Sequence, residues 1–73
     1  MRQAVLYQDE TGVWVAEVPS LPGCISQGAT RDEALANIAD AAEAWIEGMT
    51  ELGEPVPEAP GRVEVHAIPG TAA

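Results

Sequence analysis

Residues 13–46 form the block that most constrains how this chain can fold, because a strand, a Pro/Gly loop, a short strand and a capped amphipathic helix are predicted in unbroken succession. The spacing of Thr30 and Glu33 predicts a capping box, in which the threonine side chain accepts from the Glu33 amide and the glutamate side chain reaches back. Apolar residues then follow in steps of three and four, which predicts one amphipathic helix with a core-facing side. Gly53 ends this helix, and the prolines at positions 55, 57 and 60 prevent it from resuming. The apolar helix positions are Leu35, Ile38, Ala39, Ala42, Trp45, Ile46, Met49 and Leu52.

Short β-rich segments lie on both sides of the helix. Residues 4–7 and 13–18 are rich in β-branched and aromatic side chains, and the turn residues 9–12 between them predict a hairpin. The sequence predicts a short third strand at residues 24–27, after a Pro/Gly loop, and a fourth at residues 62–68. A right-handed helical crossover leaves strands three and four parallel. The sequence therefore predicts an α+β domain of order β-β-β-α-β, a mixed sheet with one helix on one face.

The predicted sheet has more apolar surface than one helix can cover. A loop of residues 9–12 would pair Tyr7 with Trp14 and Leu6 with Val15, which leaves both sheet faces apolar. The uncovered face predicts a partner, with homo-oligomerisation through the sheet or its edge as the leading account. Alternatively, a turn of different length shifts the pairing, and the Pro-rich segment after the helix covers the rest. The candidate partner or oligomer interface comprises Leu6, Val13, Val15, Glu17 and Leu21.

Length and charge restrict the function further. The 73 residues predict one domain, residues 1–68, and a frayed tail, residues 69–73. Three arginines, no lysine and 12 Asp plus Glu give a net charge of −9, which repels nucleic acid and favours a basic partner. Cys24 is the only cysteine, which predicts no intrachain disulfide and fits a reducing compartment. Because neither a signal peptide nor a membrane span is recognisable, we expect a cytoplasmic protein.

Carboxylates are the first candidates for chemistry on such a sheet. The topology places Asp9 and Glu10 at the same end as Asp32 and Glu33, and clustered carboxylates that hold Mg²⁺ ions can hydrolyse phosphodiesters. Turn formation explains the first pair without catalysis, and the helix dipole explains the second. We therefore expect these four residues to be structural.

The remaining candidates are His66, Cys24 and the loop at residues 19–23. His66 has no His or Cys partner at metal-ligand spacing, and nothing in the sequence supplies Cys24 with a base. The loop either recognises a partner, with prolines that lower the entropy lost on binding, or simply turns the chain and hides Leu21. The sequence predicts no catalytic residue, no metal ligand and no cofactor.

Ordered motifs relate the chain to one known family. The motifs are Trp14-Val15-Ala16-Glu17-Val18-Pro19, Leu21-Pro22-Gly23-Cys24, Gly28-Ala29-Thr30, Asp32-Glu33-Ala34 and Glu54-Pro55-Val56-Pro57-Glu58. With these motifs, residues 4–65 resemble the HicB antitoxins, small proteins that neutralise HicA toxins. The resemblance implies a degenerate ribonuclease-H-like sheet in strand order 3-2-1-4.

The resemblance implies a binding protein rather than an enzyme. Such an antitoxin would occlude the active site of a small, basic, RNA-cleaving HicA-type toxin, which carries its own catalytic histidine. Arg2, Arg31 and Arg62 are too few and too dispersed for a phosphate-binding stripe, and no DNA-binding motif precedes Ala73. We therefore expect no direct nucleic-acid binding. The alternatives are a minimal metal-dependent nuclease of the same fold and an orphan oligomerisation module without a toxin.

Overall fold

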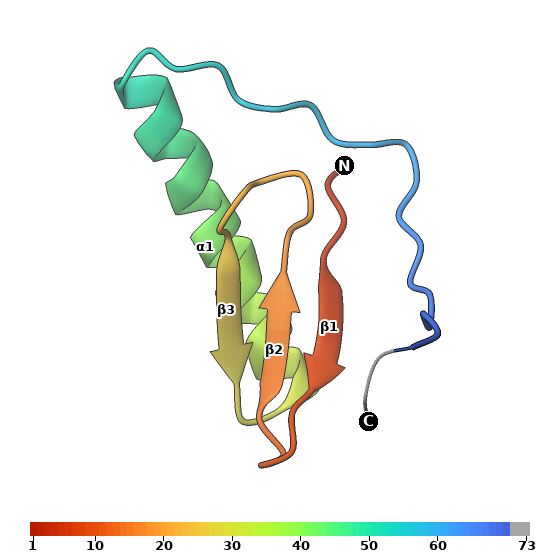
Figure 1. Ribbon diagram of the computed structural model, residues 1–73. Coiled ribbons are helices and arrows are strands. Elements are labelled where there is room, and N and C mark those ends of the chain that lie inside the picture. Colours follow the sequence, from red (N-terminus) through yellow and green to blue (C-terminus); the bar gives the residue numbers. More distant parts are fainter. Residues whose placement is uncertain (71–73) are drawn as a thin grey trace.

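The computed structural model describes residues 1–70, which form a three-stranded antiparallel sheet and one helix (Figure 1). The sheet order is β1-β2-β3, and the helix α1 lies behind the sheet in this view. The α+β class, the first three strands and the helix are as predicted. Part of the predicted tail, residues 71–73, lies outside the described residues. The elements are β1 (Val5–Gln8), β2 (Trp14–Glu17), β3 (Ile25–Gly28) and α1 (Arg31–Glu51).

The predicted fourth strand is not formed. Residues 62–68 carry no strand, so the described sheet is purely antiparallel, and the predicted mixed sheet of four strands is wrong. The order 3-2-1 of the first three strands is as predicted, and the ribonuclease-H-like likeness stays a prediction. The segment runs down the β1 side of the sheet without joining it (Figure 1). The radius of gyration is 13.8 Å, against about 11 Å for a compact chain of this length. Strand propensity needs cross-strand neighbours, and the side chains of Arg62 and His66 pair instead with nearby Glu64.

The predicted hairpin register is wrong by one residue. Tyr7 lies opposite Val15 and Leu6 opposite Ala16, because Asp9 stays in the ladder and its amide donates to the Val13 carbonyl at 2.9 Å. The loop is therefore residues 10–12. Gly12 closes it with a positive φ of 89°, and its amide donates to the Asp9 carbonyl. This is the three-residue hairpin with a left-handed final residue, which inserts a bulge.

The corrected register decides which side chains the helix covers. Leu6, Trp14 and Ala16 share the covered face, since successive side chains of a strand point to opposite sides. They pack on a small core beneath α1, in which Leu21 and Cys24 are also buried. The other face carries Val5, Tyr7, Val15, Glu17, Ile25 and Gln27.

Helix and sheet approach each other closely at Gly28. A Cβ atom added there would lie 2.5 Å from the Ala34 amide nitrogen and 2.9 Å from the Glu33 carbonyl carbon. Real Cβ atoms do not come this close to backbone. Only glycine therefore allows the first turn of α1 to sit against the end of β3.

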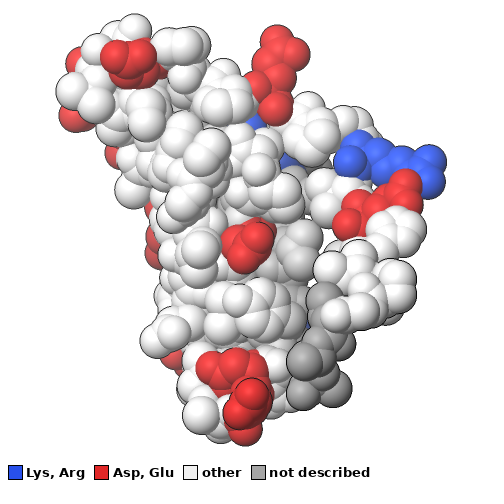
Figure 2. All heavy atoms as spheres, in the orientation of Figure 1, with Lys and Arg blue, Asp and Glu red and all other residues white. Residues whose placement is uncertain are grey.

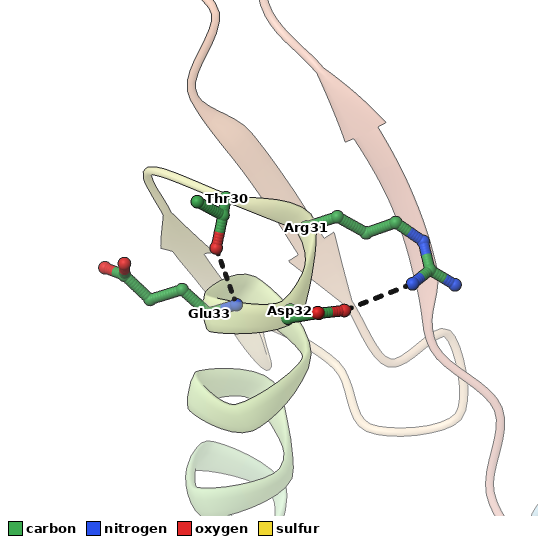
Figure 3. A network of polar contacts seen from close by, with 4 residues as sticks. All are labelled: Thr30, Arg31, Asp32 and Glu33. Atoms are coloured by element: carbon green, nitrogen blue, oxygen red, sulfur yellow. Dashed lines mark hydrogen bonds and ion pairs between the residues drawn. The ribbon is translucent and has the colours of Figure 1, made fainter.

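Both ends of α1 lie where the sequence predicts them. The Thr30 hydroxyl accepts from the Glu33 amide at 3.1 Å, which confirms the N-cap (Figure 3). The Glu33 carboxylate points away from Thr30, so only half of the capping box is formed. At the other end Gly53 has a φ of 72°, and its amide donates to the Thr50 carbonyl while the Glu54 amide donates to that of Met49. This pair of bonds is a Schellman motif.

Candidate functional site

The most prominent candidate site is the sheet face that α1 leaves uncovered, called the open sheet face below. It consists of two rows across the three strands: Val5, Glu17 and Ile25 in one row, and Tyr7, Val15 and Gln27 in the next. Tyr7 is 50% exposed and Ile25 is 58% exposed. Figure 2 shows this side of the molecule, where uncharged atoms dominate and acidic groups are isolated.

Glu17 lies at the middle of this face. It belongs to the central strand, and its cross-strand neighbours are Val5 and Ile25. The residue is half-buried, yet within residues 1–70 its carboxylate has no hydrogen bond or ion pair. Burying a carboxylate between apolar side chains is unfavourable unless a cation or a hydrogen-bond donor reaches it.

The arginines of the chain are engaged elsewhere. Arg2 donates to the Ser20 hydroxyl at 2.9 Å and to the Pro57 carbonyl at 2.6 Å. Arg31 pairs with Asp32 at 3.3 Å, as Figure 3 shows, and Arg62 pairs with Glu64. With no lysine in the sequence, the described chain supplies no cation to Glu17.

The structure redistributes the five residues of the predicted interface. Val15 and Glu17 lie on the open sheet face, and Val13 precedes them on the same side by strand alternation. Leu6 packs against the core under the helix, and Leu21 is only 1% exposed. Both are therefore removed from the candidate interface. Sequence reasoning placed Val5 and Tyr7 on the other face and did not consider Ile25, which the short third strand brings beside Glu17.

The Pro/Gly loop at residues 19–23 turns the chain and hides Leu21, which was one of its two predicted roles. The Leu21 amide donates to the Val18 carbonyl at 3.0 Å, and the Cys24 amide donates to the Leu21 carbonyl at 3.0 Å. These two turns direct Leu21 into the core. Trp45 of α1 holds the loop against the helix, since its indole N–H donates to the Pro22 carbonyl at 3.1 Å.

Two of the four carboxylates considered for catalysis, Asp9 and Asp32, have structural partners. Asp9 accepts from the Thr11 amide, the Thr11 hydroxyl and the Val13 amide at 2.6–3.0 Å. These bonds, the Thr11 hydroxyl foremost, hold the pKa of Asp9 below its usual range. Asp32 pairs with Arg31 at the start of the helix. Within residues 1–70 no three His, Cys, Asp or Glu residues come together in a way that could hold a metal ion.

The pKa of Asp9 makes a prediction about acid stability. A carboxyl whose pKa is depressed by folding contributes stability above its unfolded-state value, about 3.8, and loses it as the pH falls through the folded-state value. We expect Asp9→Asn to lower the melting temperature near neutral pH and to match the wild type in strong acid. Thermal melts monitored by circular dichroism over this range test it. Glu10→Gln is the control, and a difference for Asp9→Asn that persists unchanged in acid contradicts the prediction.

The other two candidate residues are unremarkable in their surroundings. The exposed His66 ring lies 2.7 Å from the Glu64 carboxylate, two residues away. Cys24 is buried in the core and directly precedes β3. Within residues 1–70 no helix combines the length and the apolar character needed to cross a membrane.

Acidic side chains also gather on the outer side of α1. Asp40, Glu43, Glu47 and Glu51 are all exposed, and Figure 2 shows acidic groups along the edge of the molecule where the helix runs. The last turn of the helix contains no basic residue. Its negative dipole end therefore lies among acidic groups that it does not favour. A basic partner would find complementary charge along this whole side.

Comparisons with known proteins find relatives in sequence and in structure. A UPF0150 protein of Thermoplasma acidophilum is 42% identical over 64 residues, which cover 86% of this chain and 93% of that protein. One of Archaeoglobus fulgidus is 42% identical over 43 residues, 59% of this chain and 62% of that protein. The crystal structure of the N-terminal domain of the Burkholderia pseudomallei antitoxin HicB is similar, with a TM-score of 0.69 and 34% sequence identity. That match covers 77% of this chain and 66% of the other.

The family itself is shown by a match along nearly the whole chain. A model of the HicB-like antitoxins of bacterial toxin–antitoxin systems matches residues 3–69. The chain spans less than two thirds of the Archaeoglobus relative and 66% of the Burkholderia chain. The sequence motifs, the three-stranded sheet with its capped helix and these matches agree: the chain belongs to the HicB-like antitoxin family of bacterial toxin–antitoxin systems.

Proposed function

We propose that this chain neutralises a small, basic, RNA-cleaving toxin of the HicA type by binding over its active site. The observation that supports this best is the open sheet face, where an apolar surface surrounds the unpaired carboxylate of Glu17. Such a surface suits a protein partner that is both apolar and cationic. Membership of an antitoxin family gives that partner its class.

The mechanism we propose is occlusion assisted by charge. A toxin that cleaves RNA must bind phosphates, so its active-site surface has to be basic. An antitoxin with a net charge of −9 attracts that surface at long range and raises the association rate. Once bound, it covers the site sterically and places negative charge where the RNA backbone would lie. The chain itself performs no chemistry in this mechanism.

This function implies a cellular setting. The pair would act in the cytoplasm, where the RNA substrates of such a toxin are. The homo-oligomer that the sequence predicts stays a prediction. Two features favour it: the outer edge of β1 has no neighbouring strand in the described sheet, and Val65 beyond the helix is 79% exposed.

Co-expression tests the proposal. If a gene for a small basic protein lies beside the gene for this chain, it is expressed alone and together with it; if no such neighbour exists, the orphan oligomerisation module is favoured instead. We expect growth arrest from the basic protein alone, rescue by co-expression, and one stable complex on purification. RNA cleavage by the purified toxin should fall in proportion to added antitoxin until the two are equimolar.

Two results would contradict the proposal in different ways. Growth arrest that persists although the chain is folded and abundant would mean that it does not neutralise this toxin. Mg²⁺-dependent RNA cleavage by the chain alone, abolished by changing Asp9 or Asp32, would instead identify it as a nuclease.

A further inference from the structure

We infer that the open sheet face is the surface that receives the toxin, and that a lysine or arginine of the toxin pairs with Glu17 at its centre. This inference rests on the proposed function and deepens it, because it assigns the contact to one face of the antitoxin. The arrangement of residues on the face, the state of the Glu17 carboxylate and the charge inventory of the chain support it separately.

The face has the composition of an interface core. Its exposed apolar side chains, Tyr7 and Ile25, lie on the two outer strands, while Val15 and Glu17 occupy the central one. Tyrosine is among the residues that contribute most to binding, since it combines a large apolar ring with a polar end. A protein placed on this face would bury both exposed side chains and Glu17 together.

Glu17 determines the chemistry of the partner. Covering the face with an apolar surface would desolvate its carboxylate without compensation, which is strongly unfavourable. Covering it with a lysine or arginine converts the same burial into a charge-assisted hydrogen bond. The partner that fits therefore presents a cation within an apolar surface.

A second copy of this chain does not meet that requirement. A two-fold dimer formed through the face would bring the two Glu17 carboxylates toward one another near the axis. Each copy carries 3 arginines against 12 acidic residues. Those arginines are engaged with Ser20 and Pro57, with Asp32 and with Glu64. The charge balance of the chain thus favours a basic protein over a second copy.

The test measures the affinity of antitoxin variants for the HicA-type protein of the co-expression experiment, inactivated at its catalytic histidine. Titration calorimetry at high ionic strength suppresses the contribution of exposed charges. We expect Glu17→Gln to weaken binding about tenfold and Glu17→Arg about a hundredfold or more, because like charges in contact cost several kcal/mol. Glu43→Gln and Glu43→Arg, on the exposed side of α1, should change affinity less than about threefold.

Each outcome decides between the possibilities. If the wild type does not bind, the proposed function fails and this assignment fails with it. If the wild type binds and the Glu17 variants bind no worse than their Glu43 counterparts, the function survives and the assignment is overturned. A larger mass for Glu17→Gln alone by light scattering, with unchanged toxin affinity, would make a second copy the occupant and overturn it too. Circular dichroism confirms folding, and the isosteric Glu17→Gln keeps the test valid if Glu17→Arg does not fold.

Discussion

Gly28→Ala is expected to destabilise the domain by about 3 kcal/mol, the upper range for overpacking a tight contact. The added methyl group would lie 2.5 Å from the Ala34 amide nitrogen, so it meets backbone of α1 rather than a side chain that can move aside. Relief requires the helix to shift away from β3, which opens the core around Ala34 and Ile38. Chemical denaturation monitored by circular dichroism measures the loss.

Gly48→Ala is the matched control for this substitution. Gly48 lies in the exposed part of α1, and a Cβ atom there would meet nothing within 4 Å. The same change should therefore stabilise the protein by about 0.5–1 kcal/mol, since alanine is the better helix former. Equal effects of the two substitutions would contradict the close approach at Gly28.

Leu21→Ala is the second change with a large expected effect, about 2–5 kcal/mol. Leu21 is the largest fully buried side chain among the described residues, and it fills the space between the sheet and α1. A domain of this size holds only about 3–5 kcal/mol of net stability. The variant should therefore be largely unfolded at room temperature, which the loss of near-ultraviolet circular dichroism would reveal.

Leu52→Ala removes the same atoms from an exposed position. Leu52, at the C-cap of α1, is 74% exposed, so its truncation should change stability by less than about 0.5 kcal/mol. Because binding of the toxin needs a folded antitoxin, Leu21→Ala should also abolish rescue of growth, whereas Leu52→Ala should preserve it. Retention of a cooperative wild-type melt by Leu21→Ala would show that the loop does not anchor the core.

Local chemistry explains what the sequence predicted correctly. The N-cap at Thr30 and the Schellman glycine at Gly53 act on the few backbone groups beside them, so their residue types reveal them directly. The three strands before the helix likewise follow from short runs of β-branched and aromatic residues between turn residues. Each of these features depends on neighbours in the sequence.

Features that depend on distant partners were predicted less well. Residues 62–68 have a strand-like composition, but a strand needs a pairing edge, and three prolines lie between these residues and the helix. The role of Gly28 depends on the backbone of Ala34 across the sheet–helix contact, which no local pattern reveals. The hairpin register turned on whether Asp9 belongs to the loop or to the ladder.

The residues of the candidate interface were likewise predicted only in part. Val15 and Glu17 were placed in the interface, and they lie on the open sheet face. Leu6 was included because the predicted register assigned it to the same side as Val15, whereas the observed register turns it toward the helix. Leu21 was included for its place in an apparently exposed loop, which two hydrogen-bonded turns fold inward. Face assignment on a short hairpin thus depends on one backbone hydrogen bond.

The hairpin loop at residues 10–12 therefore acts as a spacer whose length matters more than its composition. Removing or adding one residue would slide β1 against β2 by one position and exchange Leu6 with Tyr7 between the two sides. Natural variation among such domains should replace residues in this loop freely, as long as the final position tolerates a left-handed backbone, but should avoid insertions and deletions. A single-codon deletion in this loop would exchange the side chains of β1 between the core and the open sheet face.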